Sequence, residues 1–319
     1  LVTGGAGFIG SHVVRALRRS GAEVVVADLV RSADQDTVSV QVDLRSPVEI
    51  ERVLPRGVDS VVHLAAVTSV LRSVECPAET FATNVAMTAE LLERARTIGV
   101  GTFVFASSNA VVGAARELPI TEHSDLAPLT PYGATKAAAE MLLSAYQASY
   151  GMRCATLRLP NVYGPGMGRK DSVIPRLMRA AGSGQGFEVF GDGRQMRDYL
   201  YVGDVVAAVE IALAGDRVGE VAGPIVVGSG VSTSVLELVA LVGGITGRDI
   251  PVRHVPRKAG EMSRVMVDSS RAHGFGWRPT INLEEGLSRV WQSWPGRGTG
   301  AGPVLVGPAR LAPAAGLGL

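Results

Sequence analysis

The first 160 residues alternate between short apolar runs rich in β-branched residues and amphipathic stretches of helical length. This alternation predicts βαβ units around a parallel sheet. Runs such as SVVHLAA and FVFAS lack the alternation of apolar and polar residues seen in half-exposed strands, so helices should cover both faces. The pattern predicts an α/β fold, a doubly wound parallel sheet. Strands are expected at Glu23–Ala27, Ser60–Leu64, Thr102–Ala106 and Arg153–Leu159, and helices at Gly10–Ser20, Ala78–Ile98 and Tyr132–Tyr150.

The second half of the chain has a different character, because glycine and proline become frequent from residue 161 onward and the periodic stretches shorten. We expect a sheet domain of residues 1–160 plus about 198–228, and a smaller α+β lobe of residues 161–197 and 229–295. Residues 296–319 are rich in Gly, Ala and Pro without periodicity, which predicts a disordered tail. Because the chain begins with LVTGG, we expect a few further strand residues upstream.

Composition excludes several classes of partner. The 31 basic and 30 acidic residues nearly cancel and form no Lys/Arg-rich run, which argues against nucleic acid and membrane surfaces. No apolar stretch reaches the roughly 18 residues of a membrane span. The two cysteines, Cys76 and Cys154, have no metal-binding spacing and form no disulfide framework, so no metal and a cytoplasmic location are expected.

A glycine-rich segment, TGGAGFIGSH, places Gly4, Gly7 and Gly10 just before an amphipathic helix. Glycines there let the backbone turn tightly and approach a pyrophosphate held by amide groups at the helix N-terminus, as in dinucleotide-binding Rossmann folds. Glycine-rich turns also occur without a ligand, so the spacing alone supports both readings about equally.

The strand EVVVAD ends in Asp28, eighteen residues after Gly10. A carboxylate at that position accepts hydrogen bonds from the adenosine ribose and repels a 2′-phosphate, which favours NAD over NADP. Arg31 would support the opposite preference by pairing with that phosphate. Asp43 is placed to face the adenine, although an ordinary surface aspartate is almost as good an interpretation.

The segment PYGATKAAAE places Tyr132 and Lys136 four residues apart, on one face of a helix. A lysine there lowers the pKa of the phenol, so that the tyrosine can accept a proton from a sugar hydroxyl near neutral pH. Ser107 and Ser108 directly follow the strand expected at Thr102–Ala106, within reach of that helix. A serine hydroxyl there could orient the substrate oxygen.

Several segments in register, TGGAGFIG, DSVVHLAA, SSNAVVG, YGATK, RLPNVYGPG and GDGRQMRDYLYVGDV, resemble the extended short-chain dehydrogenases/reductases, the NAD-dependent epimerase/dehydratase family. The resemblance covers residues 1–294. It implies a catalytic triad of Ser108, Tyr132 and Lys136, with NAD along His63 to Ala66. The implied cofactor contacts are Gly4, Gly7, Phe8, Ile9, Gly10, Asp28, Asp43, Leu44, Leu64, Ala65, Ala66, Asn84, Tyr132 and Lys136.

The same resemblance implies that the second lobe holds the nucleoside diphosphate of a sugar substrate, with Val189 and Phe190 packed against its base. Arg197 would pair with the diphosphate, although without the family motif a salt bridge to Asp198 or Asp204 ranks first. Lys258 stands where relatives carry an arginine and lacks its bidentate fork, so neighbouring Arg257 is a possible substitute. The implied substrate contacts are Ser108, Asn109, Tyr132, Asn161, Val189, Phe190, Arg197, Lys258 and Glu261.

Asn109 and Ala110 indicate which reaction the chain performs. Relatives that dehydrate or decarboxylate the sugar carry acidic residues there, and neither an amide nor a methyl group acts as an acid or base. The resemblance therefore implies an NAD-dependent 4-epimerase of nucleotide sugars, working through a transient 4-keto sugar. The alternatives are a keto-sugar reductase, a 4,6-dehydratase or decarboxylase, and a non-catalytic dinucleotide sensor.

Departures from the family pattern suggest an unusual sugar. Val112, Met87 and Thr68 replace residues that relatives usually carry, and Val265 stands where an aromatic residue limits the space at the C2 group. Relatives pair into homodimers through the two long helices expected at Ala78–Ile98 and Tyr132–Tyr150. We therefore expect a homodimer, with burial against the chain's own sheet as the alternative.

Overall fold

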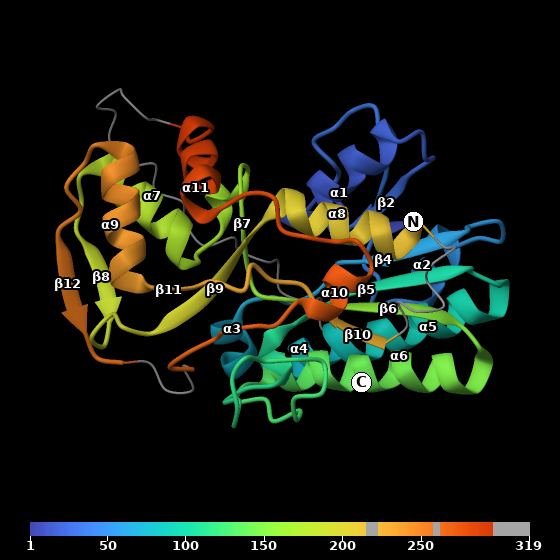
Figure 1. Cartoon of the computed structure of the whole chain (residues 1–319). Coiled ribbons are helices and arrows are strands. Elements are labelled where there is room, and N and C mark those ends of the chain that lie inside the picture. Colours follow the sequence, from blue (N-terminus) through green and yellow to red (C-terminus); the bar gives the residue numbers. More distant parts are fainter. Residues whose placement is uncertain (215–222, 258–261, 296–319) are drawn as a thin grey trace, which may run out of the picture.

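The computed structural model describes residues 1–214, 223–257 and 262–295. Its centre is a sheet of seven strands, each parallel to its neighbours (Figure 1). The strand order is β10-β6-β5-β4-β1-β2-β3. It reverses between β1 and β4, and ligands of such sheets bind beyond the carboxyl ends of the strands at that point. The bounds are β1 Val2–Thr3, β2 Val25–Asp28, β3 Val38–Gln41, β4 Ser60–His63, β5 Thr102–Ser108, β6 Arg153–Leu159 and β10 Gly223–Val226.

Helices cover both faces of this sheet, which confirms the predicted doubly wound fold (Figure 1). Within β5, Val104 packs into the core under α1 and α8, whereas Phe103 and Phe105 pack into the opposite core under α2, α5 and α6. Both faces of the strand are buried, which explains the uninterrupted apolar run. These helices are α1 Phe8–Arg19, α2 Pro47–Val53, α5 Met87–Ile98, α6 Pro131–Tyr150 and α8 Val202–Leu213.

The predicted strand at Arg153–Leu159 is confirmed, whereas β5 is longer than expected. It extends to Ser108, because Ser107 and Ser108 continue the pairing with Arg158 and Leu159 of β6. The two serines therefore belong to the strand instead of following it. A strand position fixes the direction of their side chains more firmly than a loop would.

The range Ala78–Ile98 is helical as expected, but the helix is not regular. The chain forms α4 (Pro77–Phe81), then a π-helical segment at Ala82–Ala86, then α5. A π turn inserts one extra residue and rotates the helix face, and such turns are frequent at functional sites. Helix α6 begins as expected, since Thr130 caps the amide of Gly133 and Pro131 takes the first helical position.

The smaller α+β lobe is confirmed, with its own apolar core that includes Leu177, Val242 and Leu287 (Figure 1, left). Its strands pair as β11-β9-β7 and as β12-β8. Strand β9 contributes Leu200 to the core of the central sheet and Tyr199 to the core of the lobe, so we propose that the domain boundary runs through β9. The bounds of the elements of the lobe are β7 Asn161–Tyr163, β8 Phe187–Phe190, β9 Met196–Tyr201, β11 Ser232–Ser234, β12 Val252–Val255, α7 Val173–Ser183, α9 Val235–Thr246 and α11 Leu283–Gln292. Two further short helices, α3 Val70–Glu75 and α10 Ser270–Gly274, lie on the side of the central sheet domain.

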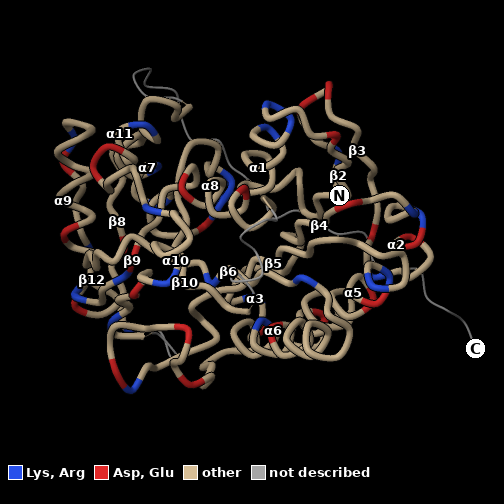
Figure 2. Tube along the Cα trace, turned by 45° about the vertical axis from the view of Figure 1, so that its right-hand side comes forward, with Lys and Arg blue, Asp and Glu red and all other residues tan. Residues whose placement is uncertain are grey.

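Basic and acidic residues are scattered over the described trace of both lobes (Figure 2). Within that part of the chain, no helix combines the length and the apolar character needed to cross a membrane. Residues 296–319, expected to be a tail, lie outside the described residues.

Candidate active site

The glycine loop packs so closely that side chains would not fit at two of its positions. Gly4 has φ +68°, and a Cβ there would lie 2.6 Å from the amide nitrogen of Ala65, beyond β4. A Cβ on Gly10 would lie 2.1 Å from the carbonyl oxygen of Gly4. At the N-terminus of α1, Gly7 is exposed and no side chain caps the helix. Uncapped amides and a bare backbone surface fit a pyrophosphate, with Phe8 and Ile9 in the first turn.

Asp28 is the last residue of β2 and lies beside this loop. Its carboxylate accepts hydrogen bonds from the amides of Ala6 at 3.0 Å and Val30 at 3.3 Å and remains half-buried. Arg31, the residue that would favour NADP, is exposed. Asp43 pairs with Arg45, which donates to both carboxylate oxygens, as expected for an ordinary surface aspartate. Leu44 beside it is buried.

Asn84 joins the exit of β4 to helix α6. Its Oδ1 accepts from the amide of Val67 at 2.8 Å, and its Nδ2 donates to the carbonyl of Val67 at 3.1 Å and to the hydroxyl of Thr135 at 3.1 Å. The π-helical segment places this side chain. The connection fixes the strand exit, where Leu64, Ala65 and Ala66 are half-buried, against the helix that carries Tyr132 and Lys136.

The side chain of His63, the first of the residues that the resemblance places along the cofactor, is buried. It is 1% exposed, and its ring nitrogens contact the hydroxyls of Thr3 at 2.7 Å and Thr88 at 2.9 Å. Thr88 in turn donates to the carbonyl of Asn84. Burial, and then the charge of Lys136, lower the pKa of His63 to about 3, so the ring is neutral. In the sequence, the only sign of this series of hydrogen bonds is a histidine inside an apolar strand.

Ser108, Tyr132 and Lys136 lie together where β5 meets the first turns of α6. The hydroxyl of Ser108 is near enough to the phenol of Tyr132 to influence its pKa, and both residues are half-buried. Lys136 is 3% exposed; its Nζ donates to the carbonyl of Ala106 at 2.8 Å and lies 4.5 Å from the ring centroid of Phe105.

Burial and neighbouring groups shift the pKa values of Lys136 and Tyr132. Burial lowers the pKa of Lys136 to about 7, and the carboxylate of Glu140 acts in the opposite direction. Burial raises the pKa of Tyr132, and the neighbouring hydroxyl of Ser108 opposes that change. A phenol paired with a hydroxyl and placed one helical turn from an amine can exchange a proton with a bound alcohol.

Asn109 and Ala110 continue from Ser108 into a short 3₁₀ turn, Asn109–Val111. Asn109 is 3% exposed, and neither atom of its amide has a hydrogen-bond partner. The turn therefore brings no carboxyl group to the triad, and it carries an amide whose hydrogen bonds are unmade.

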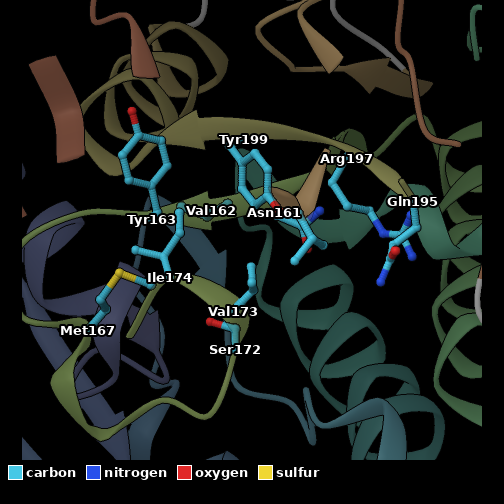
Figure 3. A pocket seen from close by; sticks show the side chains of 11 residues that line it. Asn161, Val162, Tyr163, Met167, Ser172, Val173, Ile174, Gln195, Arg197 and Tyr199 are labelled. Atoms are coloured by element: carbon cyan, nitrogen blue, oxygen red, sulfur yellow. The ribbon is translucent and has the colours of Figure 1, made fainter. Parts of the chain in front are cut away.

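A pocket in the second lobe, with about 550 Å³ of empty space, is lined by both Asn161 and Arg197 (Figure 3). Asp198 and Asp204, the predicted alternative partners of Arg197, accept hydrogen bonds from residues 229–230 and 280–281. The sequence did not single out other lining residues, because they come from separate segments, and those that lie in the motif around Arg197 carry no side chain typical of a diphosphate site. These other lining residues include Ser172, Val173, Gln195 and Tyr199.

The two residues expected to pack against the base differ in burial. Val189 is fully buried, so its side chain belongs to the core of the lobe and offers no free surface, whereas Phe190 is half-buried. Val265 is 3% exposed and packs in the cluster of Val111 and Val112 beside the triad. Lys258 and Glu261 lie outside the described residues. Within residues 1–214, 223–257 and 262–295, no group of His, Cys, Asp and Glu could hold a metal ion.

Comparison with known proteins gives the same picture. The model of the NAD-dependent epimerase/dehydratase family matches residues 1–228. A UDP-glucose 4-epimerase of Mycolicibacterium smegmatis is 35% identical over 91% of this chain and 96% of its own length. A dTDP-glucose 4,6-dehydratase of Streptomyces niveus is 35% identical over 90% of each chain. The crystal structure of the Thermotoga maritima UDP-glucose 4-epimerase with UDP-glucose superposes with a TM-score of 0.86 at 34% identity, covering 92% of this chain and 97% of that one. This chain therefore belongs to the NAD-dependent epimerase/dehydratase family.

Proposed function

We propose that this chain is an NAD-dependent 4-epimerase of UDP-sugars. The observation that carries the proposal is the geometry at the end of β5, where Ser108 lies beside the phenol of Tyr132, Lys136 lies one helical turn further on, and the residues after Ser108 are Asn109 and Ala110. This group can move one proton at a sugar hydroxyl. It offers no second acid at positions 109 and 110 for expelling water or carbon dioxide.

The two lobes divide the binding work. The pyrophosphate of NAD would lie on the N-terminus of α1 beside Gly4, Gly7 and Gly10, with Asp28 on the ribose. In the second lobe, Arg197 and Asn161 would hold the diphosphate of the sugar nucleotide, because a guanidinium suits phosphate oxygens. The sugar then reaches across to the triad.

In the reaction, Tyr132 accepts the proton of the C4 hydroxyl as that carbon becomes a carbonyl, and Ser108 orients the oxygen. When bound, NAD supplies the hydride acceptor and returns the hydride, so no net oxidation occurs. The 4-keto sugar rotates within the site before Tyr132 returns the proton. Lys136 stabilises the phenolate by its charge.

A 4,6-dehydratase is the second candidate, because one relative of equal identity bears that name. A reductase would consume added NADH and release NAD, whereas an epimerase retains NAD through many turnovers. A sensor would bind NAD and convert nothing.

The test is proton NMR of the purified protein with NAD and a panel of UDP-, dTDP- and GDP-sugars, with Tyr132→Phe as the control. New anomeric signals of a C4 epimer, absent in Tyr132→Phe, are the expected result. A 4-keto product would contradict the argument from Asn109 and Ala110. Net consumption of NADH would indicate a reductase, and binding of NAD without any conversion would indicate a sensor.

We further propose that the protein is a cytoplasmic homodimer. Phe81 of α4 and Met141 of α6 are 56% and 59% exposed, and these helices contact each other, so a second copy could cover both. Both cysteines are free thiols, as expected in a reducing compartment. A monomeric mass by light scattering at micromolar concentration would contradict the dimer.

A further inference from the structure

A buried ion pair lies directly behind the proposed catalytic residues. Glu140 of α6 and Arg158 of β6 have side chains that are 6% and 3% exposed. Arg158 donates through Nη2 to one carboxylate oxygen of Glu140 at 2.8 Å, and through Nε to both oxygens at 3.1 and 3.2 Å. Its Nη1 is directed to the carbonyls of residues 121 and 122. Bidentate geometry and full burial make this pair far more than a surface salt bridge.

The pair is joined to the triad through the last three residues of β5. Each of these residues interacts with one member of a stripe on α6 with spacing i, i+4 and i+8, which is a single helix face. The three contacts are Ala106 O with Lys136 Nζ at 2.8 Å, Ser107 Oγ with Glu140 Oε1 at 2.5 Å, and the side chain of Ser108 with that of Tyr132. Glu140 is thus the third contact between strand and helix, and its charge lies one turn from Lys136.

The charges around Lys136 are few. On its own helix lie Tyr132 and Glu140; from β4 comes His63, which is neutral; and from β6 comes Arg158, bound to Glu140. The carboxylate of Glu122, in the loop that Arg158 contacts, is directed to the amide of Val226 at 2.8 Å. Among the described residues, Glu140 is therefore the anionic side chain whose charge acts on this buried amine. The site needs that amine as an ammonium.

We propose that Glu140 is a positioning residue of the reaction: clamped by Ser107 and Arg158, its carboxylate keeps Lys136 charged and fixes the end of β5 against α6. The catalytic consequence rests on the proposed function, whereas the effect on Lys136 does not.

The test follows the ionisation of Lys136 itself. The chain has only three lysines, Lys136, Lys170 and Lys258, so NMR of protein labelled at lysine Cε gives few signals, and loss of one signal in Lys136→Arg assigns it. Titrations are made in a Tyr132→Phe background, so that two coupled groups do not titrate together. Glu140→Gln should lower the pKa of Lys136 by about one unit or more, because the ammonium loses its anionic neighbour. Arg158→Gln should raise it.

The double variant Glu140→Gln/Arg158→Gln removes both buried charges and serves if a single variant fails to fold. In this double variant the pKa of Lys136 should also be lower than in the reference protein, but the decrease should be smaller than in Glu140→Gln. Glu49→Gln, in an exposed ion pair of α2, is the matched control and should change nothing. With Tyr132 restored, the alkaline limb of kcat should move to lower pH in Glu140→Gln. An unchanged Lys136 titration in both Glu140 variants overturns the proposal. If the titration shifts but no sugar is converted, the influence of Glu140 on Lys136 stands and the epimerase assignment fails.

Discussion

The cofactor side and the substrate side of this active site are built differently. On the cofactor side, backbone packs on backbone: glycines at positions 4 and 10 leave no room for a Cβ, and Asn84 is fully bonded within the protein. On the substrate side, Asn161 is exposed and Arg197 and Gln195 are half-buried side chains around an open pocket (Figure 3).

This difference has a physical consequence. A site made of close backbone contacts cannot adjust its shape. A substitution at one of these contacts should therefore either leave the binding of NAD unchanged or abolish it. A site made of long side chains can adjust, so substitutions should give graded losses of affinity. Such a division suits an enzyme with one fixed cofactor and a sugar nucleotide whose sugar rotates during the reaction.

The largest effect is expected at the junction of the two sides. Tyr132→Phe keeps the ring but removes the proton acceptor, and kcat should fall by about 10³-fold. Binding of NAD, measured by calorimetry, should change little, because the loop at Gly4 and Gly10 is untouched. Residual kcat within tenfold of the unmodified protein would mean that another group accepts the proton.

Gly10→Ala tests the rigid side. Its methyl group would lie 2.1 Å from the carbonyl oxygen of Gly4, so the loop must move, with a loss of about 1–3 kcal/mol of stability and a large loss of NAD affinity. Gly244→Ala, in α9 with open space around the new methyl group, is the matched control and should leave NAD binding unchanged. Thermal unfolding and NAD titration measure both. Equal behaviour of the two variants would refute the close-packing argument.

Arg197→Lys tests the adjustable side. The ammonium keeps the charge but loses the bidentate fork, so KM for the sugar nucleotide should rise about tenfold with little change in kcat. Steady-state kinetics with UDP-glucose would measure this. A loss confined to kcat would place Arg197 at the chemistry instead of at the diphosphate.

Asp28→Ala should give an effect no larger than that of Arg197→Lys. Removing the carboxylate weakens NAD about tenfold, roughly 1.4 kcal/mol, and improves the relative affinity for NADP. Competition binding of the two dinucleotides would show it. An unchanged ratio would indicate that Asp28 serves only to hold the loop through Ala6.

Sequence patterns predicted the sheet and placed Tyr132 and Lys136 on one helix face, because the residues concerned are contiguous or follow a short period, whereas the catalytic role of Ser108, Tyr132 and Lys136 was implied by the family resemblance. Tyr132 and Lys136 share one helix, and Ser108 ends a neighbouring strand. The π-helical segment around Asn84 was not predicted, since the composition of Ala78–Ile98 suits an ordinary helix equally well.

The second lobe was harder to predict, because its pocket joins segments far apart in the chain. Gln195 and Tyr199 meet Ser172 only through the fold, with no spacing to indicate it. Val189 and Phe190 could not both face a base, since successive residues of a strand point to opposite sides. The structure buries the first and leaves the second half-exposed.

The most direct measurement is to follow deuterium from C4 of a labelled UDP-sugar through the reaction. The proposed mechanism predicts that the label remains at C4 in the epimeric product, because the hydride leaves and returns at the same carbon without exchange with water. Label found at C6 of a 4-keto-6-deoxy sugar, or lost to free NADH, would contradict the epimerase assignment.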